Sequence, residues 1–153
     1  MTLLRPLFIS FLVIAFSSCK EEGTWINFRY DDVRAYYYSN DQQGTHGHSE
    51  ILVNGKLNPT TLNPKGVELN SEQISLVGHA LNGNKNYGEA MSADCYIPHH
   101  GIVFYNKNEI VAHISICFMC DRIESVPNNR LNQTDILKSV FEELGIPISP
   151  EEF

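Results

Sequence analysis

Residues 95–120 read CYIPHHGIVFYNKNEIVAHISICFMC, and this stretch decides much of the fold. Two apolar and β-branched runs, 101–105 and 109–117, stand on either side of the polar residues 106–108. Such runs favour strands, and a short Asn-containing link between them is typical of a hairpin turn. The sequence therefore predicts an antiparallel hairpin.

The predicted turn also indicates which residues face each other. If the turn is centred near residues 107–108, the numbers of paired residues add up to about 215. His100 would then lie opposite Ser115, and Cys95 opposite Cys120. We therefore expect the cysteines and the paired histidines of this stretch to converge at the open end of the hairpin. These residues are Cys95, His99, His100, Cys117 and Cys120.

The convergence of these side chains suggests a metal site. Zinc is typically held by four tetrahedral Cys and His ligands, and a Cys-x-x-Cys segment commonly supplies two of them. Cys117 and Cys120 form such a segment, Cys95 offers a third thiolate, and His100 or His99 offers the fourth ligand. Copper(I) also suits these soft ligands. Four protein ligands would close the site, so it would be structural rather than catalytic.

Two other chemistries fit the same cysteines and need no metal. An oxidising compartment favours a disulfide from Cys95 to Cys117 or Cys120, which leaves one thiol over. A redox dithiol at 117–120 is the other reading, although redox pairs are activated at a helix N-terminus and this pair follows a predicted strand. His113 shares a strand face with Cys117, so it would either support the site from behind the ligands or lie in the core.

The N-terminal residues predict export and lipidation. Residues 1–18 combine Arg5 with an apolar run at 7–16 that is shorter than the ~20 residues needed to cross a bilayer, as in a secretory signal peptide. Two small serines then precede Cys19, which resembles the lipobox of bacterial lipoproteins, whose cysteine is diacylated with fatty acids such as palmitate. We therefore expect a lipidated Cys19, followed by a short tether through residue 23.

The residues after Cys19 bear on the destination. Lys20-Glu21-Glu22 resembles the signal that sends lipoproteins of Bacteroidota to the outer face of the outer membrane. The alternative is a solvated polar tether without a sorting role. The expected localisation is the bacterial outer membrane, with the domain at the cell surface.

Composition and net charge narrow the classes of function that this sequence allows. The chain has 153 residues, 42% of them hydrophobic and 19% charged, which suits one globular domain over residues 24–153. A net charge of -7 and scattered basic residues argue against a nucleic-acid partner. The same charge gives no attraction to anionic lipid, so membrane attachment depends on the covalent anchor.

Two helices and further strands complete the predicted fold. Helical spacing of apolar residues predicts helices over 71–82 and 134–144, capped by Asn70 or Ser71 and by Thr134 or Asn132. The aromatic run at 33–39 predicts a strand, Asn54-Gly55 predicts a hairpin, and 121–132 is expected to be polar loop. The order ββα-ββα predicts an α+β domain, a small antiparallel sheet with two helices on one face.

The stretch from Cys95 to Cys120 also resembles a group of uncharacterised small lipoproteins of Bacteroidota. The shared pattern is Cys-x-x-Pro-His-His-Gly-Ile followed by Cys-Phe-x-Cys. In a looser form of this pattern the position of His99 is often Arg, which favours His100 as the ligand. The resemblance implies a common local site and surface localisation, and it brings no activity.

The common catalytic motifs are also missing from the sequence. The sequence contains no nucleophile elbow, phosphate-binding loop, dinucleotide fingerprint or His-Glu-x-x-His motif, so a non-enzymatic role is expected. The partner would be an unidentified protein or small molecule.

Overall fold

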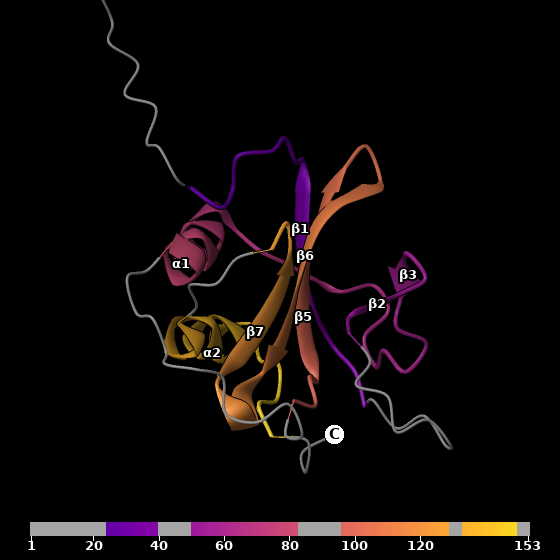
Figure 1. Cartoon of the computed structure of the whole chain (residues 1–153), viewed down its shortest axis with the longest axis vertical. Helices are drawn as coiled ribbons and strands as arrows, with labels where there is room; N and C mark the ends of the chain where they lie inside the picture. The colour runs from indigo at the N-terminus through magenta and orange to yellow at the C-terminus, as the bar shows by residue number, and fades with distance from the viewer. Residues whose placement is uncertain (1–23, 40–49, 83–95, 129–132, 150–153) are drawn as a thin grey trace, which may run out of the picture.

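The computed structural model describes residues 24–39, 50–82, 96–128 and 133–149, and it confirms the α+β class. An antiparallel sheet of order β4-β1-β5-β6-β7 forms the centre, and β2-β3 forms a separate hairpin (Figure 1). The strands are β1 (Asp32–Tyr37), β2 (Leu52–Val53), β3 (Lys56–Leu57), β4 (Val67–Glu68), β5 (His100–Asn106), β6 (Glu109–Cys117) and β7 (Arg122–Val126). The helices are α1 (Ser71–Asn82) and α2 (Thr134–Glu143).

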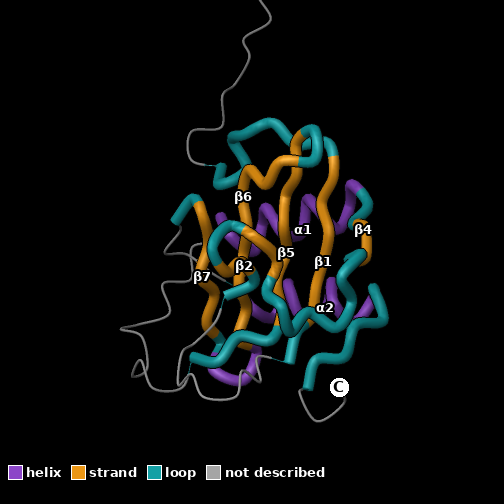
Figure 2. Tube along the Cα trace, turned by 90° about the vertical axis from the view of Figure 1, so that its right-hand side faces the viewer, coloured by secondary structure: helices purple, strands orange, loops and turns teal. Residues whose placement is uncertain are grey.

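The sheet has one face against the helices and one face against a loop-rich segment. Because side chains alternate along a strand, Ala35, Phe104 and Ile116 pack with both helices, whereas Tyr38 and Val103 lie in a second core cluster on the other face. Figure 2 shows the segment containing β2 in front of the sheet and the helices behind it. We call these the helix face and the outer face.

The β5-β6 hairpin is confirmed, but its register is not the predicted one. Lys107 and Asn108 have φ values of 53° and 66°, as a two-residue hairpin turn with left-handed central residues requires. A β-bulge then follows, because Phe104 pairs with residue 112 while Tyr105 pairs with residue 110. His100 consequently lies opposite Ile116 and not opposite Ser115.

The helices begin close to where their sequences indicate. At α1, Asn70 Oδ1 accepts from the Gln73 N–H at 2.9 Å, and Gln73 Oε1 accepts from the Asn70 N–H at 3.0 Å, which makes a reciprocal cap. The cap expected for α2 is wrong in part. Gln133 occupies the N-cap without a side-chain bond, and Thr134 Oγ1 donates to Asp121 Oδ1 at 3.1 Å instead. Asn132 lies outside the described residues.

The expectation of a polar loop over 121–132 is wrong for its first part. Residues 122–126 form β7, which pairs with β6 at the edge of the sheet. Only Ile123 and Ser125 point to the helix face, and Arg122 and Glu124 alternate with them, so the apolar signal of this strand is weak. Of the described segments, neither helix has the length and apolar content needed to cross a membrane.

Candidate cysteine and histidine site

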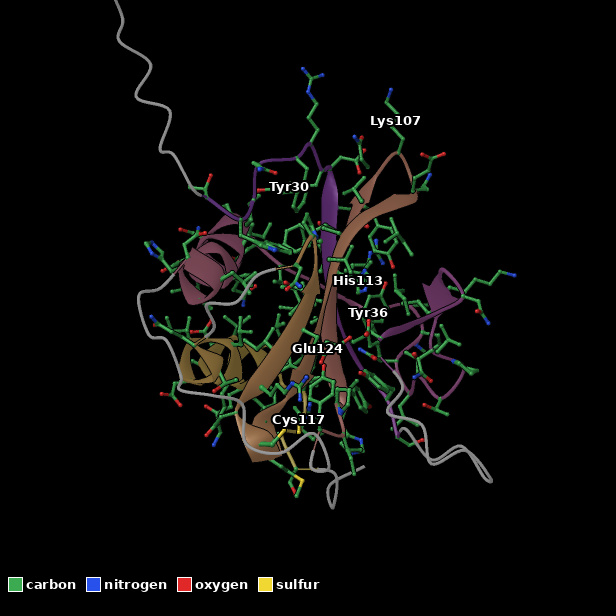
Figure 3. The ribbon with its side chains drawn as sticks, viewed as in Figure 1. Tyr30, Tyr36, Lys107, His113, Cys117 and Glu124 are labelled. Atoms are coloured by element: carbon green, nitrogen blue, oxygen red, sulfur yellow. The ribbon has the colours of Figure 1, made fainter. Side chains whose placement is uncertain are left out.

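The Cys-x-x-Cys segment forms a single tight turn between two strands. β6 ends at Cys117, a 3₁₀ turn spans Phe118–Cys120, and Asp121 takes a left-handed conformation (φ 48°, ψ 42°) before β7 begins. Cys117 is buried, Cys120 is half-buried, and the Cys120 Sγ lies 3.9 Å from the Cys117 carbonyl oxygen. Figure 3 shows Cys117 at the end of the sheet opposite Lys107. Both cysteines therefore lie at the open end of the hairpin, as predicted.

His99 extends the sheet beside Cys117. Its N–H donates to the Ile116 carbonyl at 3.2 Å, and its own carbonyl accepts from the Tyr38 N–H at 2.9 Å. Alternation along the strand therefore places the His99 side chain on the outer face, the face that carries Cys117. The His99 Nδ1 lies 3.1 Å from the Tyr38 carbonyl oxygen, and as the donor in this bond it fixes the orientation of the ring.

His100 points to the opposite face. Its side chain is 1% exposed, its Nε2 lies 2.6 Å from the Pro147 carbonyl oxygen, and its ring centroid lies 4.8 Å from that of Phe118 and 5.1 Å from that of Phe141. Burial lowers the pKa of His100 from 6.5 to about 4, so the ring is neutral at pH 7. The structure therefore separates His100 from Cys117, which disagrees with the preference for His100 as the ligand. The bulge in β6 and the pleat of the sheet cause this separation.

Cys95 lies outside the described residues, as do Cys19, the signal peptide and the tether. The residue after Cys95 is held firmly on the outer face. The Tyr96 side chain is buried, its hydroxyl donates to the Ser115 carbonyl at 3.2 Å, and the Arg122 guanidinium lies 4.6 Å from its ring centroid. Arg122 pairs with Cys117 across the β6-β7 ladder. The chain thus enters β5 next to the two described cysteines.

His113 lies further along the outer face. It is 9% exposed, and its Nε2 is 3.5 Å from a carboxylate oxygen of Glu50. Burial lowers the pKa of His113, and the interaction with Glu50 opposes this shift. Four residues along a strand separate it from Cys117, about 13 Å at 3.3 Å per residue. Its partner is therefore Glu50, and a supporting role behind the cysteines remains a prediction.

Metal ligation is not established by these residues alone. Within residues 24–39, 50–82, 96–128 and 133–149, no three His, Cys, Asp or Glu side chains are grouped as metal ligands, and Cys95 falls outside these ranges. Comparison with known proteins gives no match to a family model, a curated protein or a solved structure. A functional proposal for this chain therefore rests on its fold and on the residues around the Cys-x-x-Cys turn.

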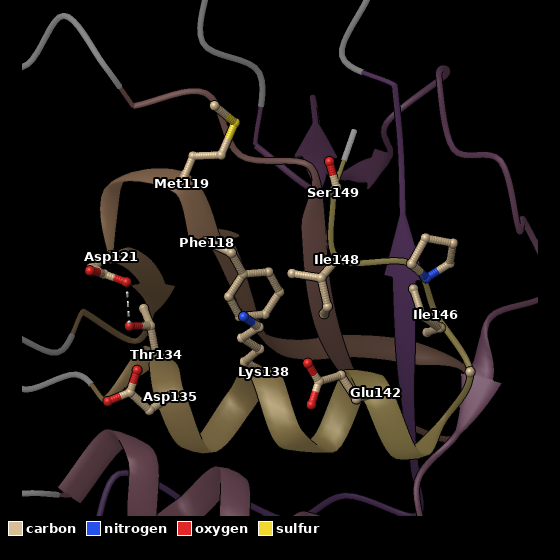
Figure 4. Close-up of a pocket in the computed structure, with 12 residues that line it drawn as sticks. Phe118, Met119, Asp121, Thr134, Asp135, Lys138, Glu142, Ile146, Ile148 and Ser149 are labelled. Carbon is tan, nitrogen blue, oxygen red and sulfur yellow. Dashed lines mark hydrogen bonds between the residues drawn. The ribbon is translucent and has the colours of Figure 1, made fainter. Parts of the chain in front are cut away.

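A pocket lies beside the cysteine turn, and the sequence did not predict it. It measures about 980 Å³ and lies between the Cys-x-x-Cys turn, α2 and the C-terminal segment (Figure 4). Phe118 and Met119 form one wall, Lys138 and Glu142 project from α2, and Ile148 closes another side. The Met119 side chain is 79% exposed. Two large apolar residues between the cysteines were the available signal, but the sequence does not show that α2 faces them.

Proposed function

We propose that this chain is an exported bacterial lipoprotein that is anchored to the outer membrane through Cys19. We further propose that its single α+β domain holds a structural metal ion at the open end of the β5-β6 hairpin. The proposed ligands are Cys95, His99, Cys117 and Cys120. The observation that carries the proposal is the placement of Cys117, Cys120 and His99 at the open end of one hairpin. A site with four protein ligands has no open coordination position, so the proposed role is binding or interaction rather than catalysis.

The donor set suits zinc better than a hard cation. Three thiolates and one imidazole form a tetrahedral set that zinc favours, and copper(I) is the alternative for the same soft ligands. The hydrogen bond at 3.1 Å between the His99 Nδ1 and the Tyr38 carbonyl oxygen also fits, because metal-bound histidines usually donate their second ring N–H to such an acceptor. The metal would tie the β5 entry to the β6-β7 turn and so stabilise the domain.

A disulfide-stapled interaction lipoprotein is the second candidate. The burial of Cys117, at 2% exposure, is typical of an inert structural cysteine, and Cys95 directly precedes the anchored residue Tyr96. A bridge from Cys95 to either cysteine of the turn would close the same end of the hairpin. A redox dithiol gains less support, because Cys117 ends a strand and is followed by a 3₁₀ turn rather than an α-helix.

The anchor is tested by replacing Cys19. We expect Cys19→Ser to abolish incorporation of labelled palmitate completely, because the thiol that receives the diacylglycerol is removed. The measurement is metabolic labelling in the native host, followed by mass spectrometry of the N-terminal peptide. Cys120→Ser is the control and should keep the label. A chain that loses no palmitate when Cys19 is replaced would contradict the lipoprotein assignment.

The metal site is tested by native mass spectrometry of the mature lipidated chain, purified in mild detergent without added metal. We expect a mass increase of one zinc ion, lost completely in Cys117→Ser and reduced in His99→Ala. His100→Gln is the matched control, because its side chain lies on the helix face and glutamine can still donate to the Pro147 carbonyl. A metal-free mass two hydrogens below the reduced value would show the disulfide instead. Equal loss of metal in both histidine variants would contradict the choice of His99.

A further inference from the structure

Contacts on both sides of Met119 fix the turn that forms one wall of the pocket. The Asp121 Oδ1 accepts from the Thr134 Oγ1 at 3.1 Å, which ties the end of the turn to the first residue of α2. The Phe118 ring is half-buried, and its centroid lies 4.8 Å from that of the buried His100 ring. Met119 lies between these two fixed points and is 79% exposed. The turn therefore presents a large apolar side chain to solvent from a well-anchored backbone.

The chain that follows α2 forms the opposite wall. Gly145 has a φ of 68°, and its N–H and the next one both donate to carbonyls of the last helical turn at 3.0 Å. This glycine cap ends the helix and turns the chain back beside it. The Pro147 carbonyl then lies 2.6 Å from the His100 Nε2, which holds this segment in place. Figure 4 shows Ile148 projecting into the pocket toward Phe118. Both apolar walls are thus formed before any partner binds.

The rim of the pocket carries more negative than positive charge. Asp135, Lys138 and Glu142 are spaced by three and four residues along α2, so they share one face of the helix, and all three line the pocket. Asp121 adds a third carboxylate from the turn. These four side chains are exposed, so a partner meets three carboxylates and one ammonium group. Such a rim attracts a cationic partner and repels an anionic one.

We propose that this pocket is a docking site for a protein segment in which large apolar side chains stand next to lysine or arginine. The apolar side chains would insert between Met119, Phe118 and Ile148, and the basic ones would meet the carboxylates of the rim. A volume of about 980 Å³ is enough for a few side chains, and methionine adapts well to different apolar partners. The inference goes beyond the proposed function and requires neither cysteine thiol nor a metal ion.

The test measures binding of the purified full chain, in mild detergent, to an array of synthetic peptides. In this array every combination of two large apolar residues stands between two lysines, and a matched array carries glutamates in place of the lysines. We expect binding to the lysine array to be about tenfold stronger, because like charges at the rim disfavour the glutamate peptides. The difference should shrink as salt is added, since exposed charges are screened.

Four variants locate the binding site on the molecule. We expect Met119→Ser and Glu142→Lys each to weaken binding to the lysine array about tenfold, through loss of apolar contact and of charge attraction. Leu62→Ser is the control for the first, because Leu62 is 46% exposed and does not line the pocket. Glu143→Lys is the control for the second, because Glu143 is the next residue of α2 and lies near Gln73 of α1, outside the pocket. All four positions are exposed, so the urea midpoints should stay close to that of the wild type.

The contrary outcomes are equally definite. Binding to neither array, equal binding to both, or a preference for the glutamate peptides would overturn the proposal of a basic partner. Equal losses in the pocket variants and their controls would place the binding elsewhere on the surface and overturn it as well. Displacement of the peptides by phosphatidylcholine vesicles would assign the pocket to lipid, and displacement by self-association would assign it to a second copy of the chain. Either result would also overturn the proposal.

Discussion

Phe104→Ala is expected to lower the free energy of unfolding by about 4 kcal/mol, because it empties the centre of an aromatic cluster. The Phe104 side chain is 0% exposed in the middle of β5. Its ring centroid lies 5.5 Å from that of Trp25, 5.4 Å from that of Phe28 and 5.5 Å from that of Tyr30, all in edge-on geometry. The variant loses both the buried area and these aromatic contacts, and it leaves a cavity under the N-terminal segment.

This change should also loosen the segment that joins the domain to its proposed anchor. Trp25 is held by its indole N–H, which donates to the Pro127 carbonyl at 2.8 Å, and by its backbone N–H, which donates to Asn82 Oδ1 at 2.6 Å. It is the single tryptophan of the chain, so its fluorescence reports on this segment directly. We expect Phe104→Ala to shift Trp25 emission to the red before global unfolding in urea. Coincident transitions by fluorescence and circular dichroism would contradict this local loosening.

A control for this prediction lies on the same strand. Val103 is equally buried but packs in the smaller cluster on the outer face, away from Trp25. Val103→Ala should lower the urea midpoint less, because it removes less volume. It should leave Trp25 emission unchanged until the whole domain unfolds. The two variants together separate loss of the N-terminal contacts from general loss of core packing.

The sequence predicted the parts of the fold with strong local signals. The range of α1 and the two-residue turn at Lys107-Asn108 both agree with the structure, because capping residues and left-handed turn residues act locally. Strand β7 was missed because only one large apolar side chain, Ile123, marks its buried face. Strand β4 has two residues, Val67 and Glu68, which is too few for any period to be visible.

The candidate site was predictable in location but not in detail. Pairing across one hairpin was enough to bring Cys117 and Cys120 to the same end as the histidines. The choice between His99 and His100 depends on the face of the sheet, and a single bulged residue changes the register by one. Nothing in the local sequence marks that bulge.

Gly101 shows how closely the outer face is packed around this site, and Gly101→Ala is expected to lower the free energy of unfolding by about 3 kcal/mol. A methyl group at this position would lie 2.5 Å from the Ile51 Cβ and 2.6 Å from its Cγ1. Gly101 pairs with Tyr36 on one side and Ser115 on the other, so neither neighbouring strand leaves room for the backbone to shift. Overpacking at such a position strains the side chains around it.

Gly78→Ala is the matched control, because it makes the same chemical change in a permissive place. A methyl group at Gly78 in α1 would lie 3.4 Å from the Ile26 Cδ1, an ordinary contact, and alanine favours a helix by up to about 1 kcal/mol over glycine. Urea unfolding should therefore show a lower midpoint for Gly101→Ala and an equal or higher one for Gly78→Ala, with unchanged slopes. Tolerance of alanine at Gly101 would mean that Ile51 can move away.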